Sequence, residues 1–272
     1  MEEVDIVFVV LCYRNTDDLY DFLGSLDIIK SKHKTIIVNS FYDEETDSKF
    51  KEIADEAGCD FISIPNKGYS YGNNVGIAFA KERYKFNYLV VSNPDIVVNK
   101  WCFDKLDNTK TQNAIVVPKI ITLSGKKQNP MIPYDNKVSE YFMYKYTQNR
   151  KWINFCINVG LNKILRGLYR FFHLASSRRL NKIYCPHGSF LVFSKHALDK
   201  INPVFDDNMF LFCEESVIAI RAKEAKIPIY YTSSLCVTHK EDGSMGFLKQ
   251  QDINEFLIDS FVYYYKNYRT LN

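Results

Sequence analysis

The sequence predicts an α/β fold in which a mostly parallel sheet is flanked by helices. Residues 6–12 form a continuous run of β-branched and apolar side chains, which is typical of a strand buried on both faces. Strand and helix patterns then alternate as far as residue 91, and this order requires right-handed crossovers between parallel strands. Asp95 follows the last of these strands. Because ligands bind outside the carboxyl ends of strands in open α/β sheets, the sequence predicts a binding site there.

The first half of the chain supplies four strands and three helices. Residues 15–18 offer side chains that can cap the start of a helix carrying Leu19, Phe22 and Leu23 on one face, and Gly58 suits the end of the second helix. The expected strands are residues 6–12, 35–38, 61–64 and 88–91, and the second and third helices are expected at 43–57 and 74–81.

The second half of the chain shows a looser alternation. Strand patterns cover 114–118 and 119–123, and apolar residues recur at helical spacing from Ser139 to about Leu180. The remaining expected elements are a strand at 190–193, a helix at 214–225, a strand at 229–232 and a C-terminal helix within 247–272. No repeat or low-complexity linker divides the chain, which favours a single domain over residues 1–272 with a helical insertion near 139–182.

Composition and charge narrow the classes of function. The net charge of +3 is too small to indicate nucleic-acid binding. The 7 cysteines form no CxxC pair, which favours a reducing, cytoplasmic compartment. The first residues are acidic where a signal peptide would be basic, and no apolar stretch reaches the roughly 20 residues that span a bilayer. We therefore expect a cytoplasmic protein without a membrane span.

One segment has an uneven charge. Residues 141–182 contain no Asp or Glu, and their basic side chains are interleaved with aromatic and apolar ones. This pattern is typical of a helix or helical hairpin at an anionic membrane surface. The alternative is a helical lid or an oligomer contact, as in a homodimer, with a solvated basic face. The basic residues are Lys145, Arg150, Lys151, Lys163, Arg166, Arg170, Arg178, Arg179 and Lys182.

A polar turn at residues 66–76 precedes the third expected helix. It reads Asn66-x-Gly68-x-x-x-Gly72-Asn73-Asn74-x-Gly76. Backbone amides at the start of a helix suit phosphate, and asparagine side chains suit a sugar or a base edge. The turn lacks both the Lys-Ser/Thr of a P-loop and the GxGxxG spacing of dinucleotide-binding folds. An ordinary turn between a strand and a helix is therefore an equal alternative.

Four later side chains could hold a cation or move a proton. Mg²⁺ commonly takes one or two carboxylates plus phosphate oxygens, so Asp95 can begin such a site, and His239 could complete it. Glu214 and Glu215 follow an aromatic run at the start of a helix, where an apolar pocket can raise a carboxyl pKa toward that of a general base. The alternative is that Asp95 and His239 are ordinary loop residues. The two glutamates would then be only favourable charges at a helix N-terminus.

Taken in order, these motifs resemble the family 2 glycosyltransferases of the GT-A fold. The resemblance is strongest to the rhamnosyltransferase-like branch that builds bacterial O-antigen and capsular polysaccharides. It covers roughly residues 4–104 and 184–246. The matching segments are residues 9–15, 66–76, Asn93-Pro-Asp95, Gly188-Ser-Phe-Leu191, Phe205-Asp206, 210–215, Arg221, and His239 with Ser244.

The resemblance implies roles for individual residues. Asp95 would hold Mg²⁺ or Mn²⁺ on the diphosphate of the donor, joined by His239, and the second acid of the Glu214–Glu215 pair would be the general base. Residues 1–104 would form the nucleotide-sugar half, residues 105–246 the acceptor and catalytic half, and 247–272 a C-terminal helix. Donor binding is implied for Tyr13, Asn15, Asn39, Asn66, Gly68, Gly72, Asn73, Asn74, Asn93 and Arg221.

The implied reaction is an inverting transfer of a sugar from a nucleoside-diphosphate sugar to a hydroxyl group. The donor would be of the dTDP-rhamnose or UDP-hexose type, and the acceptor a glycan or lipid-linked glycan of surface polysaccharide synthesis at the inner face of the cell membrane. Because this family usually has Asp as its base, either Glu215 or Glu214 could take that role. The usual Asp-Asn-Ser loop is here Asn39-Ser40-Phe41, so recognition of the nucleotide base differs.

Two other classes of function remain as alternatives. A nucleotide-sugar-binding relative without catalysis would explain both departures from the family pattern. A nucleotidyltransferase has a similar sheet, but it usually carries a glycine-rich and basic phosphate loop near its N-terminus, which residues 8–14 lack.

Overall fold

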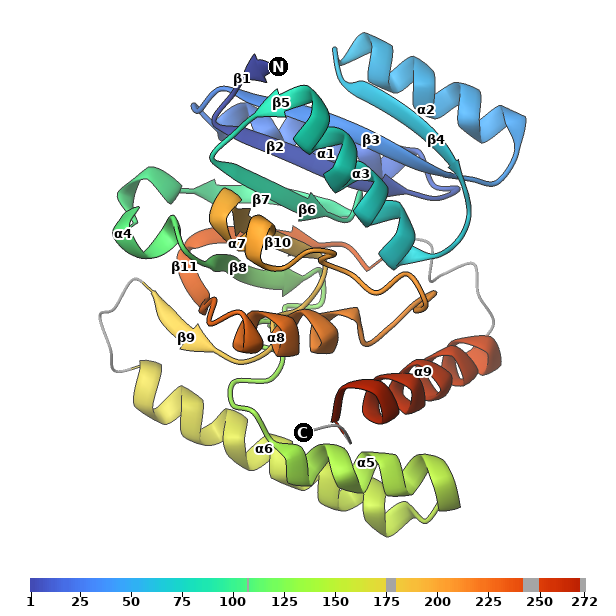
Figure 1. The fold of residues 1–272 in the computed structure, drawn as a ribbon, viewed down its shortest axis with the longest axis vertical. Coiled ribbons are helices and arrows are strands. Elements are labelled where there is room, and N and C mark those ends of the chain that lie inside the picture. Colours follow the sequence, from blue (N-terminus) through green and yellow to red (C-terminus); the bar gives the residue numbers. More distant parts are fainter. Residues whose placement is uncertain (107, 175–179, 242–249, 270–272) are drawn as a thin grey trace.

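The computed structural model of the chain has a central sheet with helices on both faces (Figure 1). It describes residues 1–106, 108–174, 180–241 and 250–269. The strands are β1 (Glu2–Glu3), β2 (Ile6–Cys12), β3 (His33–Phe41), β4 (Asp60–Pro65), β5 (Tyr84–Lys85), β6 (Tyr88–Ser92), β7 (Ile96–Trp101), β8 (Ile115–Thr122), β9 (Asn181–Ile183), β10 (Phe190–Ser194) and β11 (Ile229–His239). The helices are α1 (Asp17–Ser25), α2 (Glu44–Glu56), α3 (Tyr69–Arg83), α4 (Asn108–Thr111), α5 (Lys137–Asn149), α6 (Trp152–Leu174), α7 (Lys195–Lys200), α8 (Glu214–Glu224) and α9 (Gln250–Tyr264).

The main sheet has the strand order β4-β3-β2-β6-β10-β8-β11-β7, with β9 paired to β11. Strands β4, β3, β2 and β6 are parallel, and Val9 of β2 lies between Ile36 of β3 and Val91 of β6. The predicted α/β fold with a mostly parallel sheet is therefore confirmed. Antiparallel pairs involve the later strands, where β10 joins β6 to β8, and β11 pairs with β7 and β9.

Alternate residues of β2 point to two separate cores. Val7 and Val9 pack with the helices α3, α7 and α8, whereas Phe8 and Val10 pack with α1 and α2 on the opposite face. Because the residues of a strand alternate between faces, a strand buried on both sides must be apolar throughout, which explains the unbroken run at 6–12.

Helix α3 begins at Tyr69, so the predicted start at Asn74 is wrong. Gly68 takes a φ of 98° and ends the turn, and Gly72 donates its N–H to the Gly68 carbonyl over 3.2 Å. The glycines and asparagines that indicated a turn lie inside the helix. A Cβ atom on Gly72 or Gly76 would overlap side chains of β2, so these glycines allow α3 to approach the sheet closely.

Strand β11 is longer than the predicted strand at 229–232. Pro118 of β8 stands opposite Thr232, and the pairing then shifts so that Lys119 stands opposite Cys236. Proline cannot donate a ladder hydrogen bond, and a bulge in the neighbouring strand accommodates it. The two predicted strand pieces at 114–118 and 119–123 are accordingly one strand, β8, and β11 continues past the bulge to His239.

Of the two forms expected for the segment 139–182, a helix or a helical hairpin, the described residues show a hairpin of α5 and α6. Arg150, with a φ of 54°, ends α5, and Asn149 accepts a hydrogen bond from the Lys151 N–H before α6 begins. Lys182 lies in β9, not in a helix, while Arg178 and Arg179 lie outside the described residues. None of the helices in the described ranges is long and apolar enough to cross a bilayer.

Buried polar contacts hold the hairpin to the rest of the protein. The Ser139 side chain of α5 accepts hydrogen bonds from the amides of Asn158 and Asn162 of α6 at 2.8 and 2.7 Å. Glu140 accepts hydrogen bonds from Tyr264 at 3.0 Å and from Arg269 at 2.8 Å. Arg269 ends a π-helical turn, Tyr265–Arg269, that follows α9, so the end of the described chain anchors α5.

We expect Gly76→Ala to lower the free energy of unfolding by about 1–3 kcal/mol, because its Cβ would overlap the side chains of Val9 and Val38. Gly24→Ala in α1 is the matched control, since no atom lies within 4 Å of its Cβ position and alanine favours a helix by about 1 kcal/mol. Urea denaturation measures both changes. Equal effects of the two substitutions would contradict close packing of α3 on the sheet.

Candidate active site

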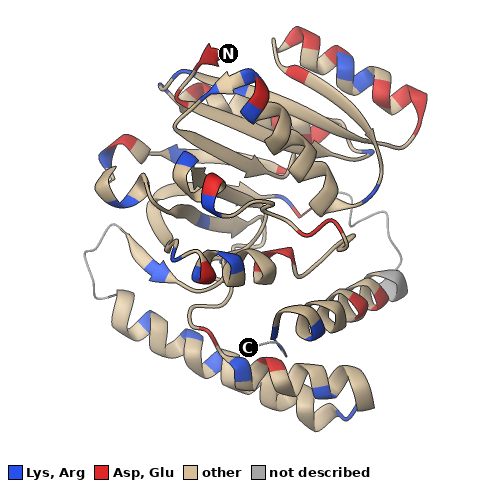
Figure 2. Ribbon diagram, in the orientation of Figure 1, with Lys and Arg blue, Asp and Glu red and all other residues tan. Residues whose placement is uncertain are grey.

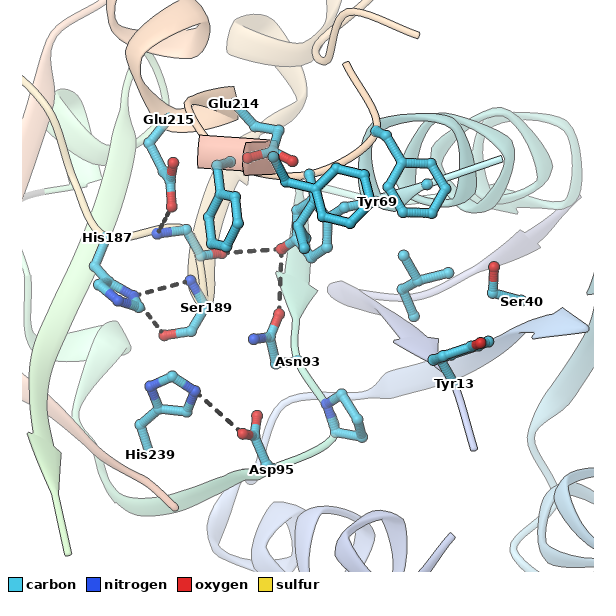
Figure 3. Close-up of a pocket in the computed structure, with 18 of the residues that line it drawn as sticks. Tyr13, Ser40, Tyr69, Asn93, Asp95, His187, Ser189, Glu214, Glu215 and His239 are labelled. Carbon is cyan, nitrogen blue, oxygen red and sulfur yellow. Dashed lines mark hydrogen bonds and ion pairs between the residues drawn. The ribbon is translucent and has the colours of Figure 1, made fainter. Parts of the chain in front are cut away.

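A cavity of about 570 Å³ opens at the carboxyl ends of β2, β3, β4 and β6 (Figure 3). This is the edge at which the sequence predicts a binding site. The predicted site residues that line the cavity are Tyr13, Asn66, Gly68, Asn93, Asp95, Glu214, Glu215 and His239.

Asp95 and His239 meet because of how β7 pairs with β11. Asp95 lies in the turn from β6 into β7, and the antiparallel register places His239 opposite Ile96, the next residue. Nε2 of His239 lies 3.2 Å from Oδ2 of Asp95. The backbone of Lys240 donates to the Asp95 carbonyl at 3.0 Å, and its side chain pairs with Asp18 of α1 at 2.8 Å. Contacts on both sides of the pair therefore fix its geometry.

The other ring nitrogen of His239 is oriented by a residue that the sequence analysis missed. Nδ1 of His239 lies 2.8 Å from Oε1 of Gln128, whose amide nitrogen donates to Glu241 at 2.8 Å. Such a contact fixes the ring orientation of a metal-binding histidine. Gln128 enters the site through a turn after β8, far from His239 in sequence, so no local pattern indicates its role.

Asp95 has the chemistry of a cation ligand. Its side chain is buried, and Oδ1 has no hydrogen-bond partner among the described residues. An unpaired buried carboxylate oxygen is costly, and a hard cation would satisfy it. The described residues contain no cluster of three acidic, histidine or cysteine side chains suited to a metal. Asp95 and His239 therefore fit a cation that takes its remaining ligands from phosphate or water.

A second histidine lies beside this pair. The ring of His187 is centred 5.5 Å from that of His239, and its Nδ1 lies 3.0 Å from Oγ of Ser189. Burial lowers the pKa of His187 to about 4, so the ring is neutral at physiological pH. His187 also lines the cavity.

The two glutamates stand at the start of α8, after an unusual backbone turn. Phe212 and Cys213 take φ values of 73° and 65°, which non-glycine residues rarely adopt. Strain of this kind clusters at functional sites. Oε1 of Glu215 accepts the Gly188 N–H at 3.1 Å, and a Cβ on residue 188 would lie 2.6 Å from that oxygen. Only glycine at 188 permits this contact.

The glutamates differ in their affinity for protons. Burial, followed by the charge of Glu215, raises the pKa of Glu214 to about 8. Burial also raises the pKa of Glu215, while the Gly188 N–H opposes the shift. The Gly188 N–H favours the ionised form of Glu215, whereas Glu214 keeps its proton near neutral pH.

Tyr69 links the cation side to the glutamates. Its hydroxyl lies 3.2 Å from both Oδ1 of Asn93 and the Gly188 carbonyl, and its backbone N–H donates to Phe210 over 2.7 Å. Burial raises the pKa of Tyr69 well above 10, so it stays a neutral hydrogen-bond donor. Tyr69 sits among the glycines of the predicted turn, so no local pattern in the sequence indicates a role for it.

An aromatic group lies at the cavity edge, just after β2 and β3. The ring of Tyr13, which lines the cavity, is centred 5.8 Å from that of Tyr42, and the guanidinium of Arg14 lies 4.1 Å from the centre of the Tyr42 ring. Asn15 does not line the cavity, because its side chain bonds to Asp17 and Asp18 at the start of α1. Asn39 also lies behind the lining, where its amide donates to Asp47 at 2.7 Å.

Four more predicted donor-binding residues lie in the supporting structure. Gly72 and Asn73 are buried within α3, with the Asn73 amide donating to the Tyr69 carbonyl at 3.0 Å. Asn74 bonds to the backbone of Phe205 and to Asp207, and Arg221 donates to the carbonyls of Pro203 and Phe205. Asn74 and Arg221 thus both hold the 203–207 loop rather than reaching the cavity.

An aromatic wall forms the remaining side of the cavity. Phe210 and Phe212 precede α8, and Phe256 of α9 stacks on Phe210 with ring centres 5.6 Å apart. Phe210 is 42% exposed. The aromatic run before the glutamates is visible in the sequence. The position of α9 at the cavity is not, because only the folded chain brings Phe256 there.

Comparison with curated proteins shows two distant relatives, while no known family model matches the chain. The chain is 21% identical to the low-salt glycan biosynthesis hexosyltransferase Agl10 of Haloferax volcanii over 228 residues, covering 83% of this chain and 64% of Agl10. It is 23% identical to the rhamnosyltransferase WbbL of Escherichia coli K12 over 241 residues, covering 86% of this chain and 83% of WbbL. The chain thus spans less than two thirds of the length of Agl10.

Solved structures share the fold. Residues 1–349 of TarS from S. aureus superimpose with a TM-score of 0.55 at 11% identity, covering 98% of this chain and 73% of that structure. GalNAc-T7, solved with UDP, GalNAc and Mn²⁺, superimposes with a TM-score of 0.57 at 10% identity, covering 87% of this chain and 43% of GalNAc-T7. The chain is thus similar in sequence to two glycosyltransferases and shares the GT-A fold of these solved structures.

We expect Glu214→Gln to stabilise the protein at alkaline pH only. Because the folded state raises the pKa of Glu214 from 4.5 to about 8, the native protein holds this proton more tightly than the unfolded chain does. The resulting stability is present below pH 4.5 and is lost as pH rises toward about 8. Glutamine should raise the Tm at pH 8.5 by on the order of 5 °C and leave it nearly unchanged at pH 4.

Differential scanning calorimetry at the two pH values measures this effect. Glu56→Gln, at an exposed position in α2, is the control and should change the Tm little at either pH. An equal Tm difference at both pH values would contradict a pKa raised by burial.

Proposed function

We propose that the protein is an inverting glycosyltransferase that moves a sugar from a nucleoside-diphosphate sugar to a hydroxyl group of a glycan or lipid-linked glycan. The observation that carries this proposal is the placement of two chemically distinct groups on one cavity. Asp95 and His239 form a pair suited to a cation, and Glu214 and Glu215 form a buried acid pair across the same space. Transfer from a diphosphate donor requires both a charge-stabilising group and a base.

The pair Asp95 and His239 is the proposed binding site for Mg²⁺ or Mn²⁺. When bound, the cation would offset the negative charge that develops on the nucleoside diphosphate as it leaves. Gln128 holds the His239 ring in place, and the unpaired Oδ1 of Asp95 is available as a ligand. GalNAc-T7, which shares the fold, was solved with UDP and Mn²⁺, and this supports a divalent cation in the proposal.

Glu215 is the proposed general base. One of its oxygens is held by the Gly188 N–H, which favours the ionised carboxylate. Glu215 accepts the proton of the acceptor hydroxyl while the hydroxyl oxygen attacks the anomeric carbon. The bond between that carbon and the diphosphate oxygen breaks on the opposite side, so the configuration inverts. The protonated Glu214 avoids placing a second negative charge beside the base.

Donor and acceptor occupy opposite ends of the proposed site. In the proposal, the nucleobase of the donor lies beside Tyr13 and Asn66, at the ends of β2 and β4. The donor sugar lies near Asn93. TarS was solved with UDP and with UDP-GlcNAc, while WbbL is a rhamnosyltransferase, so UDP-hexose and dTDP-rhamnose are the donor types proposed. The acceptor is placed against the wall of Phe210, Phe212 and Phe256, because aromatic rings suit the apolar faces of sugars.

We expect Asp95→Asn to abolish transfer and to remove the effect of Mn²⁺ on nucleotide binding. The wild-type Tm should rise with UDP or dTDP plus Mn²⁺ and rise less with EDTA, whereas the variant should not distinguish the two conditions. Asp199→Asn is the control, because Asp199 is an exposed acid paired with Lys195. Thermal shift and release of nucleoside diphosphate measure these outcomes. Full activity of Asp95→Asn, or of the wild type in EDTA, would overturn the metal site.

We expect Glu215→Gln to lower kcat by about 10²–10⁴-fold, the usual contribution of a general base, with donor affinity nearly unchanged. Because burial raises the pKa of Glu215, wild-type activity should fall on the acid side at a pH above the ordinary carboxyl value of 4.5. Glu214→Gln is the matched variant and should retain most activity. If Glu214→Gln is inactive while Glu215→Gln turns over normally, Glu214 is the base.

A further inference from the structure

The outer side of α6 exposes a large set of apolar side chains. Trp152 and Phe171, near its two ends, are 65% and 76% exposed. Between them, Ile164 and Leu168 lie one helical turn apart and are 61% and 46% exposed, and Val159 is 45% exposed. Contiguous exposed apolar surface on this scale marks an interaction site in a folded protein. The exposed apolar residues, here named the outer face of α6, are Trp152, Ile153, Val159, Ile164, Leu168, Phe171 and Phe172.

The inner side of α6 is partly polar, unlike that of an ordinary surface helix. Tyr169 packs in the core, but Asn158 and Asn162 also turn inward and bond to Ser139 of α5, while the apolar residues of the outer face stay exposed. A surface helix usually buries its apolar side in the core. The inward contacts also hold the helix in place before any partner binds. Binding therefore loses no conformational entropy from ordering this helix.

Basic side chains accompany the outer face of α6 without any acid. Lys163 and Arg170 are exposed and lie on the same side of the helix as Trp152 and Val159. Figure 2 shows blue bands and no red along α6. Arg166 uses its Nε to bond to the Met131 carbonyl at 3.0 Å, so it also holds the helix to the body of the protein.

We propose that the outer face of α6 binds the surface of an anionic lipid bilayer, with the helix lying in the plane of the headgroups. Apolar side chains would enter the boundary between headgroups and acyl chains, while Lys163 and Arg170 would contact lipid phosphates. Trp152 at one end has the amphipathic ring that favours this boundary.

Charge favours a bilayer over a second copy of the chain. A symmetric dimer through this face would bring the same basic residues toward one another without acids to balance them. An anionic membrane supplies the complementary charge. The proposal does not depend on the glycosyltransferase assignment, because it rests on α6 alone and not on the cavity.

Flotation with vesicles tests the proposal without measuring activity. The full chain is mixed at low salt with vesicles of phosphatidylcholine containing phosphatidylglycerol, or with phosphatidylcholine vesicles alone. We expect strong partitioning only with the anionic vesicles. Each basic residue near an anionic surface changes the partition coefficient roughly fivefold, so the double variant Lys163→Glu/Arg170→Glu should lose at least ~25-fold. Ile164→Glu/Phe171→Glu should lose partitioning at both low and moderate salt.

Matched controls test whether α6 itself is responsible. Lys51→Glu reverses an exposed charge on α2, and Ile28→Glu replaces an apolar residue that is 42% exposed elsewhere, so both should float like the wild type. The proposal is overturned if the wild type stays in the soluble fraction, or if the α6 variants float as well as the controls. It is equally overturned if Ile164→Glu/Phe171→Glu turns a dimer into a monomer while flotation is unchanged.

Discussion

The antiparallel pairing of β7 with β11 is the constraint on which the site depends. It sets His239 against the turn that carries Asp95, and two side chains far apart in sequence become one pair 3.2 Å apart. The bulge between Cys236 and Val237 in this pairing is part of the constraint, because a one-residue change in register turns every following side chain to the other face of a sheet. Without the bulge, the end of β11 would present a different residue to Asp95.

The opposite side of the cavity depends on a different kind of constraint. Two adjacent buried carboxyl groups cannot both ionise cheaply, and the Gly188 N–H opposes the rise in the pKa of Glu215. That hydrogen bond requires glycine at 188 and the left-handed backbone at Phe212 and Cys213 that begins α8. Tyr69 then joins this side to the cation side through Asn93 and Gly188. The two halves of the site are therefore held by one short chain of contacts.

Local patterns in the sequence predicted the elements better than they predicted the contacts. The strand at 6–12 was placed correctly, because its apolar run is a direct consequence of burial on both faces. The start of α3 was misplaced, because glycine and asparagine usually indicate a turn, and their value here lies in close packing against Leu11 and Val9. Gln128 and Phe256 could not be predicted, since only long-range pairing and the position of α9 bring them to the cavity.

The helical hairpin shows why amphipathicity alone does not assign a helix to the core. Apolar residues recur along α6 at the spacing of a buried helix, and the pattern is silent on which side faces the protein. The contacts of Ser139 with Asn158 and Asn162 decide the orientation, because unpaired amides would be costly against an apolar surface. Turning the polar side inward leaves the apolar side exposed. Exposed apolar side chains do not stabilise a monomer in water. At a lipid surface the same side chains would be buried and would stabilise binding.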